Sequence, residues 1–169
     1  KGKPVVPLDL LLDSERRILV ISGPNAGGKS ITLKTVGLLQ LMLQSGMLVT
    51  VHPDSTMGWF NGLMADIGDS QSIENELSTY SSKLAKMNHF LNAAYGKTLV
   101  LIDEFGSGSD PDLGSSMAQV FLKELNNSKT FGVMTTHYNS IKALASELPR
   151  VENGSMQFNS TDLSPEYVL

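Results

Sequence analysis

One eight-residue segment constrains the fold of this chain more than any other. Residues 23–30 read Gly-Pro-Asn-Ala-Gly-Gly-Lys-Ser and fit the pattern Gly-x-x-x-x-Gly-Lys-Ser. The apolar run 17–22 precedes them, and a helical pattern from Gly28 to about Ser45 follows, with Gly46 as a natural stop. Such a turn can point backbone N–H groups at phosphates, which also face the positive end of the helix. The motif and its context therefore predict a phosphate-binding loop rather than a plain glycine-rich turn.

The loop predicts the residues that bind phosphate and contributes to the prediction of the cofactors. Lys29 supplies a cation for the β- and γ-phosphates, and the Ser30 hydroxyl can ligate Mg²⁺. The loop by itself predicts only bound phosphate; together with Asp103, Glu104 and His137 further along the chain, it leads us to expect ATP and Mg²⁺ as cofactors. The predicted nucleotide-binding residues are the whole loop and the helical residue after it: Gly23, Pro24, Asn25, Ala26, Gly27, Gly28, Lys29, Ser30 and Ile31.

An apolar strand that ends in two carboxylates supplies the second part of the predicted site. Residues 98–102 form the strongest strand pattern in the chain, and Asp103 and Glu104 follow directly. In a parallel sheet these carboxylates would emerge beside the phosphate-binding loop. An acidic pair alone is more often solvated surface, but together with the loop it favours catalysis. Asp103 is predicted to hold Mg²⁺, and Glu104 to polarise the attacking water as a general base.

A histidine and a glycine-rich turn are further candidates. His137 follows the predicted strand 131–136, and we expect it to sense the γ-phosphate, although a lone histidine is usually structural. Residues 106–111 form a flexible turn that could reach a neighbouring subunit or could be a plain connection.

Strand-like and helix-like stretches alternate along the rest of the chain. This alternation predicts an α/β fold with a mainly parallel sheet flanked by helices on both faces. The helix after the loop is apolar on nearly all sides, so we expect it to be well buried. Other expected elements are possible strands at 49–51 and 63–67, a helix at 82–95 with one apolar face, a helix marked by Leu113, Met117, Val120, Phe121 and Leu125, a helix at 141–148, and an edge hairpin after Val151.

Composition narrows the classes of protein and partner. The 169 residues are about one domain, and the lack of cysteine excludes disulfides, thiolate metal sites and cysteine nucleophiles. With 17 acidic against 13 basic residues, the chain is poorly suited to grip nucleic acid by itself. No apolar run approaches the roughly 20 residues that span a bilayer, so we expect a cytoplasmic protein and no membrane partner. Its first residue, Lys1, and its strand-like end at Leu169 predict a fragment of a longer protein.

Three segments, in this order and spacing, resemble the ATPase domain of the MutS family. They are Gly-Pro-Asn-Ala-Gly-Gly-Lys-Ser at 23–30, the acidic pair at 103–104, and Thr-His-Tyr at 136–138. Gly-Pro-Asn-x-Gly-Gly-Lys is much more restrictive than the general loop pattern. The resemblance covers nearly the whole chain and implies that residues 1–169 are one ATPase domain. Because the family belongs with the ABC-type ATPases, it also implies a P-loop NTPase fold.

Other segments are similar to the second MutS subfamily, whose members carry an Smr domain. They are residues 65–73, 77–82 and 103–111, although Phe105, Ser107 and Ser109 depart from the commoner Leu, Ala and Thr. The mismatch-repair type would instead carry Ser-Thr-Phe-Met in the middle segment and Arg-Gly-Thr-Ser-Thr after the acidic pair.

The resemblance also implies partners. Ser78 and Thr79 would belong to a signature segment that completes the ATP site of a second subunit. The resemblance therefore implies a homodimer with shared ATP sites. From the residues alone, this pair before a helix is simply a good N-cap region. DNA or the ribosome would bind through clamp, lever and Smr parts outside this chain, and any nuclease or rRNA-binding activity would lie there. Two alternatives remain: an ATP-dependent dimerisation switch with slow hydrolysis, and the ATP-binding subunit of a membrane transporter, whose Leu-Ser-Gly-Gly-Gln signature is absent.

Overall fold

The computed structural model describes residues 5–24, 27–68, 76–106, 111–159, 164–165 and 168–169. The chain alternates strands and helices as the sequence predicts. The elements are β1 (Ile18–Ser22), α1 (Lys29–Gln44), β2 (Gly62–Asp66), α2 (Glu76–Ala93), β3 (Thr98–Ile102), α3 (Pro111–Asn127), β4 (Phe131–Thr135), α4 (Asn139–Glu147), β5 (Val151–Ser155), β6 (Phe158–Asn159) and β7 (Ser164–Pro165).

Five strands form one parallel sheet in the order β2-β3-β4-β1-β5. The α/β fold class and the parallel sheet predicted from the sequence are therefore confirmed. β4 lies between β1, which precedes the phosphate-binding loop, and β3, which precedes the acidic pair. Because all five strands run in the same direction, their carboxyl ends and the segments that follow them meet at one edge of the sheet.

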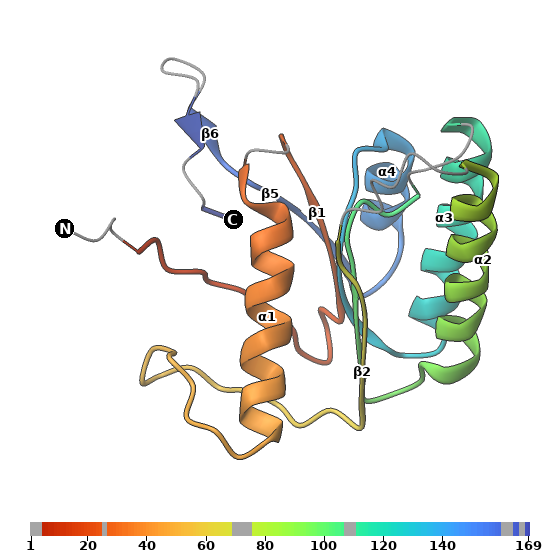
Figure 1. The fold of residues 1–169 in the computed structure, drawn as a ribbon. Helices are drawn as coiled ribbons and strands as arrows, with labels where there is room; N and C mark the ends of the chain where they lie inside the picture. Colours follow the sequence, from red (N-terminus) through yellow and green to blue (C-terminus); the bar gives the residue numbers. More distant parts are fainter. Residues whose placement is uncertain (1–4, 25–26, 69–75, 107–110, 160–163, 166–167) are drawn as a thin grey trace.

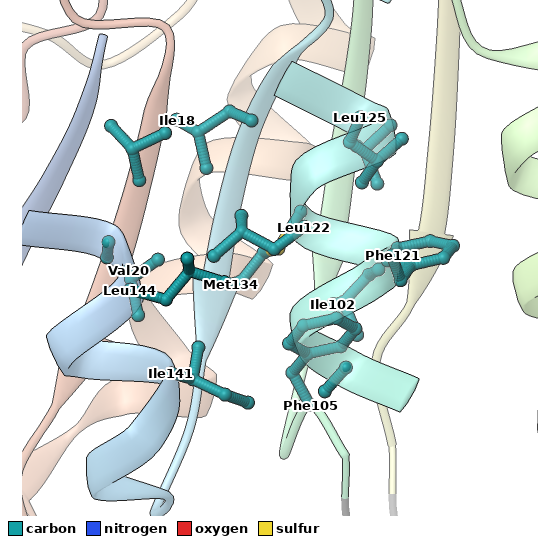
Figure 2. Close-up of a cluster of buried hydrophobic side chains, with 14 of the residues drawn as sticks. Ile18, Val20, Ile102, Phe105, Phe121, Leu122, Leu125, Met134, Ile141 and Leu144 are labelled. Carbon is teal, nitrogen blue, oxygen red and sulfur yellow. The ribbon is translucent and has the colours of Figure 1, made fainter. Parts of the chain in front are cut away.

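Helices cover both faces of the sheet. Helix α1 packs on one face, and α2, α3 and α4 lie on the other (Figure 1). The larger core cluster fills the space between the sheet and α3 and α4, as Figure 2 shows for Ile18, Met134, Phe121 and Ile141. The core strands are apolar on both faces because both faces are covered.

Helix α1 is less buried than its sequence predicts. Leu33 and Gly37 face the sheet, but Ile31, Leu38 and Leu41 are 59%, 60% and 51% exposed. The expectation of a well-buried helix was therefore wrong. The helix packs against a single layer, and a helix in such a position buries one stripe whatever the residues on its other side.

Helix α3 forms where predicted, and Phe121 and Leu125 are buried, but the buried face includes only part of the predicted series. Leu113 and Val120, two of the residues that marked the helix, are 48% and 60% exposed. The stripe that packs against the sheet and the neighbouring helices consists of Gly114, Ala118, Phe121, Leu122 and Leu125. Small residues in this stripe allow close approach to the turn after β3.

Three further expectations need correction. Residues 49–51 form no strand; they belong to the connection between α1 and β2. The tail after Val151 first adds β5 to the main sheet, parallel to β1, and only then forms the small antiparallel pair β6–β7. Helix α2 begins at Glu76, six residues before the predicted start, so its backbone already includes Ser78 and Thr79. These two residues therefore do not precede the helix.

Within the ranges that the structure describes, no helix combines the length and the apolar character needed to cross a membrane.

Candidate functional site

The phosphate-binding loop connects β1 to α1 at the carboxyl edge of the sheet. Gly23 and Gly28 have φ angles of 124° and 97°, which side chains other than glycine rarely adopt. The N–H of Gly27 donates to the Pro24 carbonyl at 3.0 Å and so closes the turn. A Cβ atom on Gly27 would lie 3.1 Å from Cβ of Met156, the residue after β5. The backbone angles and this close contact explain why glycine occupies these positions of the motif.

Lys29 is the first residue of α1 and is buried, with an exposed fraction of 3%. Its Nζ donates to the Gly23 carbonyl at 2.6 Å and therefore lies inside the loop. Burial lowers the pKa of Lys29, while the Asp103 and Glu104 carboxylates act in the opposite direction. The lysine and the acidic pair are therefore close enough to interact, although β1 and β3 are not neighbours in the sheet.

Asp103 is held by a threonine from the strand between. Its Oδ1 accepts a hydrogen bond from the Thr135 hydroxyl at 2.6 Å, and this hydroxyl accepts one from the Glu104 N–H at 2.8 Å. Thr135 is fully buried and pairs in register with Ile21 of β1. It therefore lies between the loop strand and the acidic strand and fixes the first carboxylate.

The backbone turns sharply at Glu104. Its φ angle of 49° lies in the left-handed region, where a residue other than glycine is uncommon. The next residue, Phe105, donates its N–H to the Thr135 carbonyl at 2.7 Å and buries its ring in the core. Glu104 itself is exposed. Strained backbone that surrounding contacts hold in place is common at functional sites, and here it presents a carboxylate to solvent beside Asp103.

His137 follows β4 at the same edge of the sheet and is exposed. The preceding residue, Thr136, donates its N–H to the Ile21 carbonyl at 3.0 Å, while its hydroxyl donates to the Phe105 carbonyl at 3.3 Å. These bonds tie the segment that carries His137 both to the end of β1 and to the turn after β3. Ser30 is likewise exposed, in the first turn of α1.

Some predicted site residues lie outside the described part of the chain. Asn25 and Ala26 are among them, and of Ser78 and Thr79 only the helical backbone is described. All the other predicted site residues belong to segments that begin at the carboxyl edge of the sheet. They are the remaining residues of the loop with Lys29 and Ser30, the acidic pair Asp103 and Glu104, and His137.

The side chains at this edge fit a magnesium ion bound with a nucleotide. Mg²⁺ takes oxygen ligands and is usually held by one or two carboxylates together with substrate phosphates. Asp103 accepts one hydrogen bond from Thr135, and a carboxylate has acceptor capacity for several more. The Ser30 hydroxyl lies on α1 directly after the buried Lys29. Ser30 and Asp103 are therefore the two residues best suited to hold the metal.

Sequence reasoning missed two residues of this edge. Thr135 orients Asp103, and Asp66 accepts the Asp103 N–H on its carbonyl at 2.9 Å. Both are the last residues of strands that flank β3. Polar residues at the ends of the neighbouring strands were the available signal, but their significance depends on the strand order.

Comparisons with known proteins show the family to which the chain belongs. A family model described as MutS domain V, which has a P-loop ATPase fold, matches residues 19–168. Proteins named Endonuclease MutS2 from Carboxydothermus hydrogenoformans and Clostridium kluyveri are 44% and 43% identical over 168 and 167 residues, and that from Lactiplantibacillus plantarum is 45% identical over 167.

Each alignment covers 99% of this chain, and the chain spans only 22%, 21% and 21% of the length of these three relatives. The match of domain V over most of the chain, the high-coverage relatives and the loop between β1 and α1 all lead to the same assignment: the chain is a MutS-type ATPase domain and belongs to the MutS family, in its MutS2 subfamily.

Proposed function

We propose that this chain binds ATP with Mg²⁺ and hydrolyses it to ADP and phosphate. The observation that carries the proposal is the arrangement around Thr135, which lies between the loop strand and the acidic strand and holds Asp103. The buried Lys29 interacts with the same acidic pair. A cation inside a phosphate-binding loop and an oriented carboxylate at the next strand but one are the parts that phosphoryl transfer to water requires.

Each residue has a separate task in this proposal. The loop from Gly23 to Ile31 holds the nucleotide by its backbone N–H groups, and Lys29 neutralises the β- and γ-phosphates. Ser30 and Asp103 hold Mg²⁺, which supplies positive charge to the phosphate oxygens when it is bound. Glu104 accepts a proton from the attacking water, and His137 responds to the γ-phosphate.

A second subunit completes the site in this proposal. Ser78 and Thr79 lie in the first turn of the described part of α2. An N-terminal helix turn carries positive partial charge and hydroxyl donors suited to a phosphate on another chain. Residues 1–169 would then supply two half-sites to a homodimer, one through the loop and one through α2.

We further propose that ATP turnover by this domain powers the action of a longer protein on DNA or on the ribosome. The relatives are named as endonucleases and are about five times as long as this chain, so any nuclease would lie in parts outside it. The target would be branched or mismatched DNA, in the suppression of recombination, or the ribosome, bound through its rRNA, in ribosome rescue. The net charge of −4 agrees with a domain that leaves nucleic-acid contacts to other segments.

Replacement of Glu104 tests the chemistry. Glu104→Ala removes the general base but leaves Lys29, Asp103 and the loop intact, so we expect ATP binding within about threefold of wild type and turnover lowered about 100-fold or more. The measurements are equilibrium binding of a fluorescent ATP analogue and phosphate release at saturating ATP. Glu147→Ala, an exposed glutamate at the end of α4, is the control. Turnover equal to wild type in Glu104→Ala excludes Glu104 as the base.

A further inference from the structure

We propose that Asp66 and Lys86 are positioning residues that set the orientation of α2 relative to the acidic strand end, and so couple the two half-sites of one subunit. This inference rests on the proposed function, because it assumes that α2 and Asp103 both serve ATP hydrolysis. The feature that carries it is one ion pair between β2 and α2.

Asp66 connects directly to the site through its backbone. It is the last residue of β2 and pairs in register with Ile102 of β3. Its carbonyl accepts the Asp103 N–H at 2.9 Å, so a shift of Asp66 moves the backbone of the predicted metal ligand. Asp103 is thus held from both flanking strands, by Thr135 through its side chain and by Asp66 through its N–H.

The side chain of Asp66 points to a different element. Its Oδ1 accepts a hydrogen bond from Nζ of Lys86 at 2.6 Å, and Lys86 lies in the middle of α2. Thr79 is seven residues earlier on the same helix, which places it about 10 Å away along the helix axis. The strand end that holds Asp103 is therefore linked by one residue to the helix whose first turn is proposed to enter the partner's site.

Packing alone fixes α2 incompletely. Phe90 belongs to the large core cluster, and Met87 and Leu91 pack against it. Between α2 and α3, however, an apolar groove of about 450 Å³ is lined by Leu84 and Met117, among others. Side chains that line an open groove lack close contacts across it, so α2 and α3 are not fully packed against each other here.

The ion pair constrains α2 at the edge of the sheet, on the side next to the site. A small cleft there is lined by Lys83 and Lys86 of α2 and by Asp66, Asp103 and Glu104 of the strand ends. Lysines of one helix therefore face the carboxylates of the site. Which carboxylate Lys86 contacts decides the distance between α2 and β3, and in this structure its partner is Asp66 rather than the acidic pair.

The Asp66–Lys86 ion pair is partly exposed to solvent, and this exposure distinguishes a positioning role from a role in the stability of the fold. Lys86 and Asp66 side chains are 52% and 31% exposed, and ion pairs at this exposure contribute little to the free energy of unfolding. Removal of the charge should therefore leave the fold intact. Its effect should appear in a reaction that depends on the placement of α2.

The test compares Lys86→Met, the charge-reversed double variant Asp66→Lys with Lys86→Asp, and Lys123→Met, which changes an exposed lysine of α3. For Lys86→Met we expect kcat for ATP to fall about tenfold, because small misplacements of remote groups have effects of this order. The KM for ATP should stay within about twofold, since α2 lies outside the loop that holds the nucleotide. The reversed pair should regain at least half of the wild-type kcat, and Lys123→Met should be unchanged.

The outcomes distinguish this inference from the proposed function. A wild-type protein without ATP turnover overturns the proposed function and this inference with it. Normal wild-type turnover with an equally active Lys86→Met overturns the inference alone. A loss of kcat that the reversed pair does not recover also overturns it, because the effect then belongs to Lys86 and not to the pair.

Discussion

Thr135 is the residue on which the geometry of the acidic strand end depends. One hydroxyl group donates to Oδ1 of Asp103 at 2.6 Å and accepts from the N–H of Glu104 at 2.8 Å. The same residue accepts the Phe105 N–H on its carbonyl oxygen. Three consecutive residues after β3 are therefore oriented by one fully buried side chain and its backbone. A buried network in which each polar group has a partner gives such a turn a single conformation.

Replacement of this hydroxyl by a methyl group tests its role. Thr135→Val keeps the shape of the side chain but leaves the Glu104 N–H without its acceptor, and we expect a loss of about 1–3 kcal/mol in the free energy of unfolding. Asp103 also loses the donor that orients it, so ATP turnover should fall about 10- to 100-fold. Urea denaturation and phosphate release measure the two effects.

Thr135→Ser is the matched control, because it retains the hydroxyl and removes only a methyl group. Its turnover should remain within about threefold of wild type, whatever small stability it loses from the missing methyl. If Thr135→Val and Thr135→Ser have the same turnover, the hydroxyl does not orient the acidic strand end.

At the scale of elements, the close approach of α3 to the turn after β3 determines where that turn lies. A Cβ atom at Gly114, in the first turns of α3, would collide with the carbonyl oxygen of Gly106. Gly106 itself has a φ angle of 88°, and a Cβ atom there would lie 3.0 Å from the ring of Tyr138. The turn is therefore enclosed between α3 and the start of α4.

Gly114→Ala should destabilise the protein although alanine favours helices. The helix propensity gained is about 1 kcal/mol, whereas overpacking against backbone typically costs about 1–3 kcal/mol. The oxygen that the new Cβ atom meets belongs to backbone and cannot rotate away, so the steric term wins and the turn after β3 shifts. We expect a lower unfolding midpoint in thermal denaturation and reduced ATP turnover.

Gly58→Ala provides the comparison, because a Cβ atom there has open space and the backbone is not in the left-handed region. It should change the free energy of unfolding by no more than about 1 kcal/mol, and in the stabilising direction. A Gly114→Ala protein as stable and as active as Gly58→Ala would show that α3 does not constrain the turn.

The sequence predicts these elements unequally, for physical reasons. β1, β3 and β4 were placed within a residue because strands covered on both faces are continuous apolar runs. β5 has the polar sequence Val-Glu-Asn-Gly-Ser at the edge of the sheet, and its parallel pairing with β1 spans more than 130 residues. The exposed face of α1 could not be foreseen either, since an apolar residue such as Leu38 does not reveal which side meets the sheet.

The residues of the candidate site are also unequally predictable from the sequence. The sequence patterns indicated Lys29, Asp103 and Glu104 because a motif with fixed spacing follows each strand. Thr135 and Asp66 have no such pattern, since threonine in a strand and aspartate at its end are ordinary. Their contribution comes from the strand order, which places both beside β3. Residues that act through register need the sheet topology before they can be recognised.

At the scale of the whole molecule, the predicted phosphate-binding loop and the acidic pair both lie at the carboxyl edge of the sheet. Lys29, Asp103 and Thr135 come together there within a single chain. The first turn of α2 belongs to the same chain, but in the proposed function it serves a second subunit. One chain would then contain two incomplete sites, which only a symmetric pair of chains can complete.

This arrangement predicts that ATP turnover depends on protein concentration. When the site is completed by a partner, the active fraction follows the monomer–dimer equilibrium, so turnover per chain should rise with protein concentration until the dimer saturates. For residues 1–169 alone we expect weak association, and a rise of about tenfold between 1 and 100 µM is consistent with a dissociation constant in the range of tens of micromolar. Phosphate release and sedimentation at matched concentrations should give superimposable curves. Glu104→Ala mixed in excess with wild type should keep or raise the activity per wild-type chain, because each mixed dimer retains the intact general base of its wild-type chain and the excess variant supplies a partner. Turnover per chain that is the same at every concentration would instead mean that one chain forms a complete site.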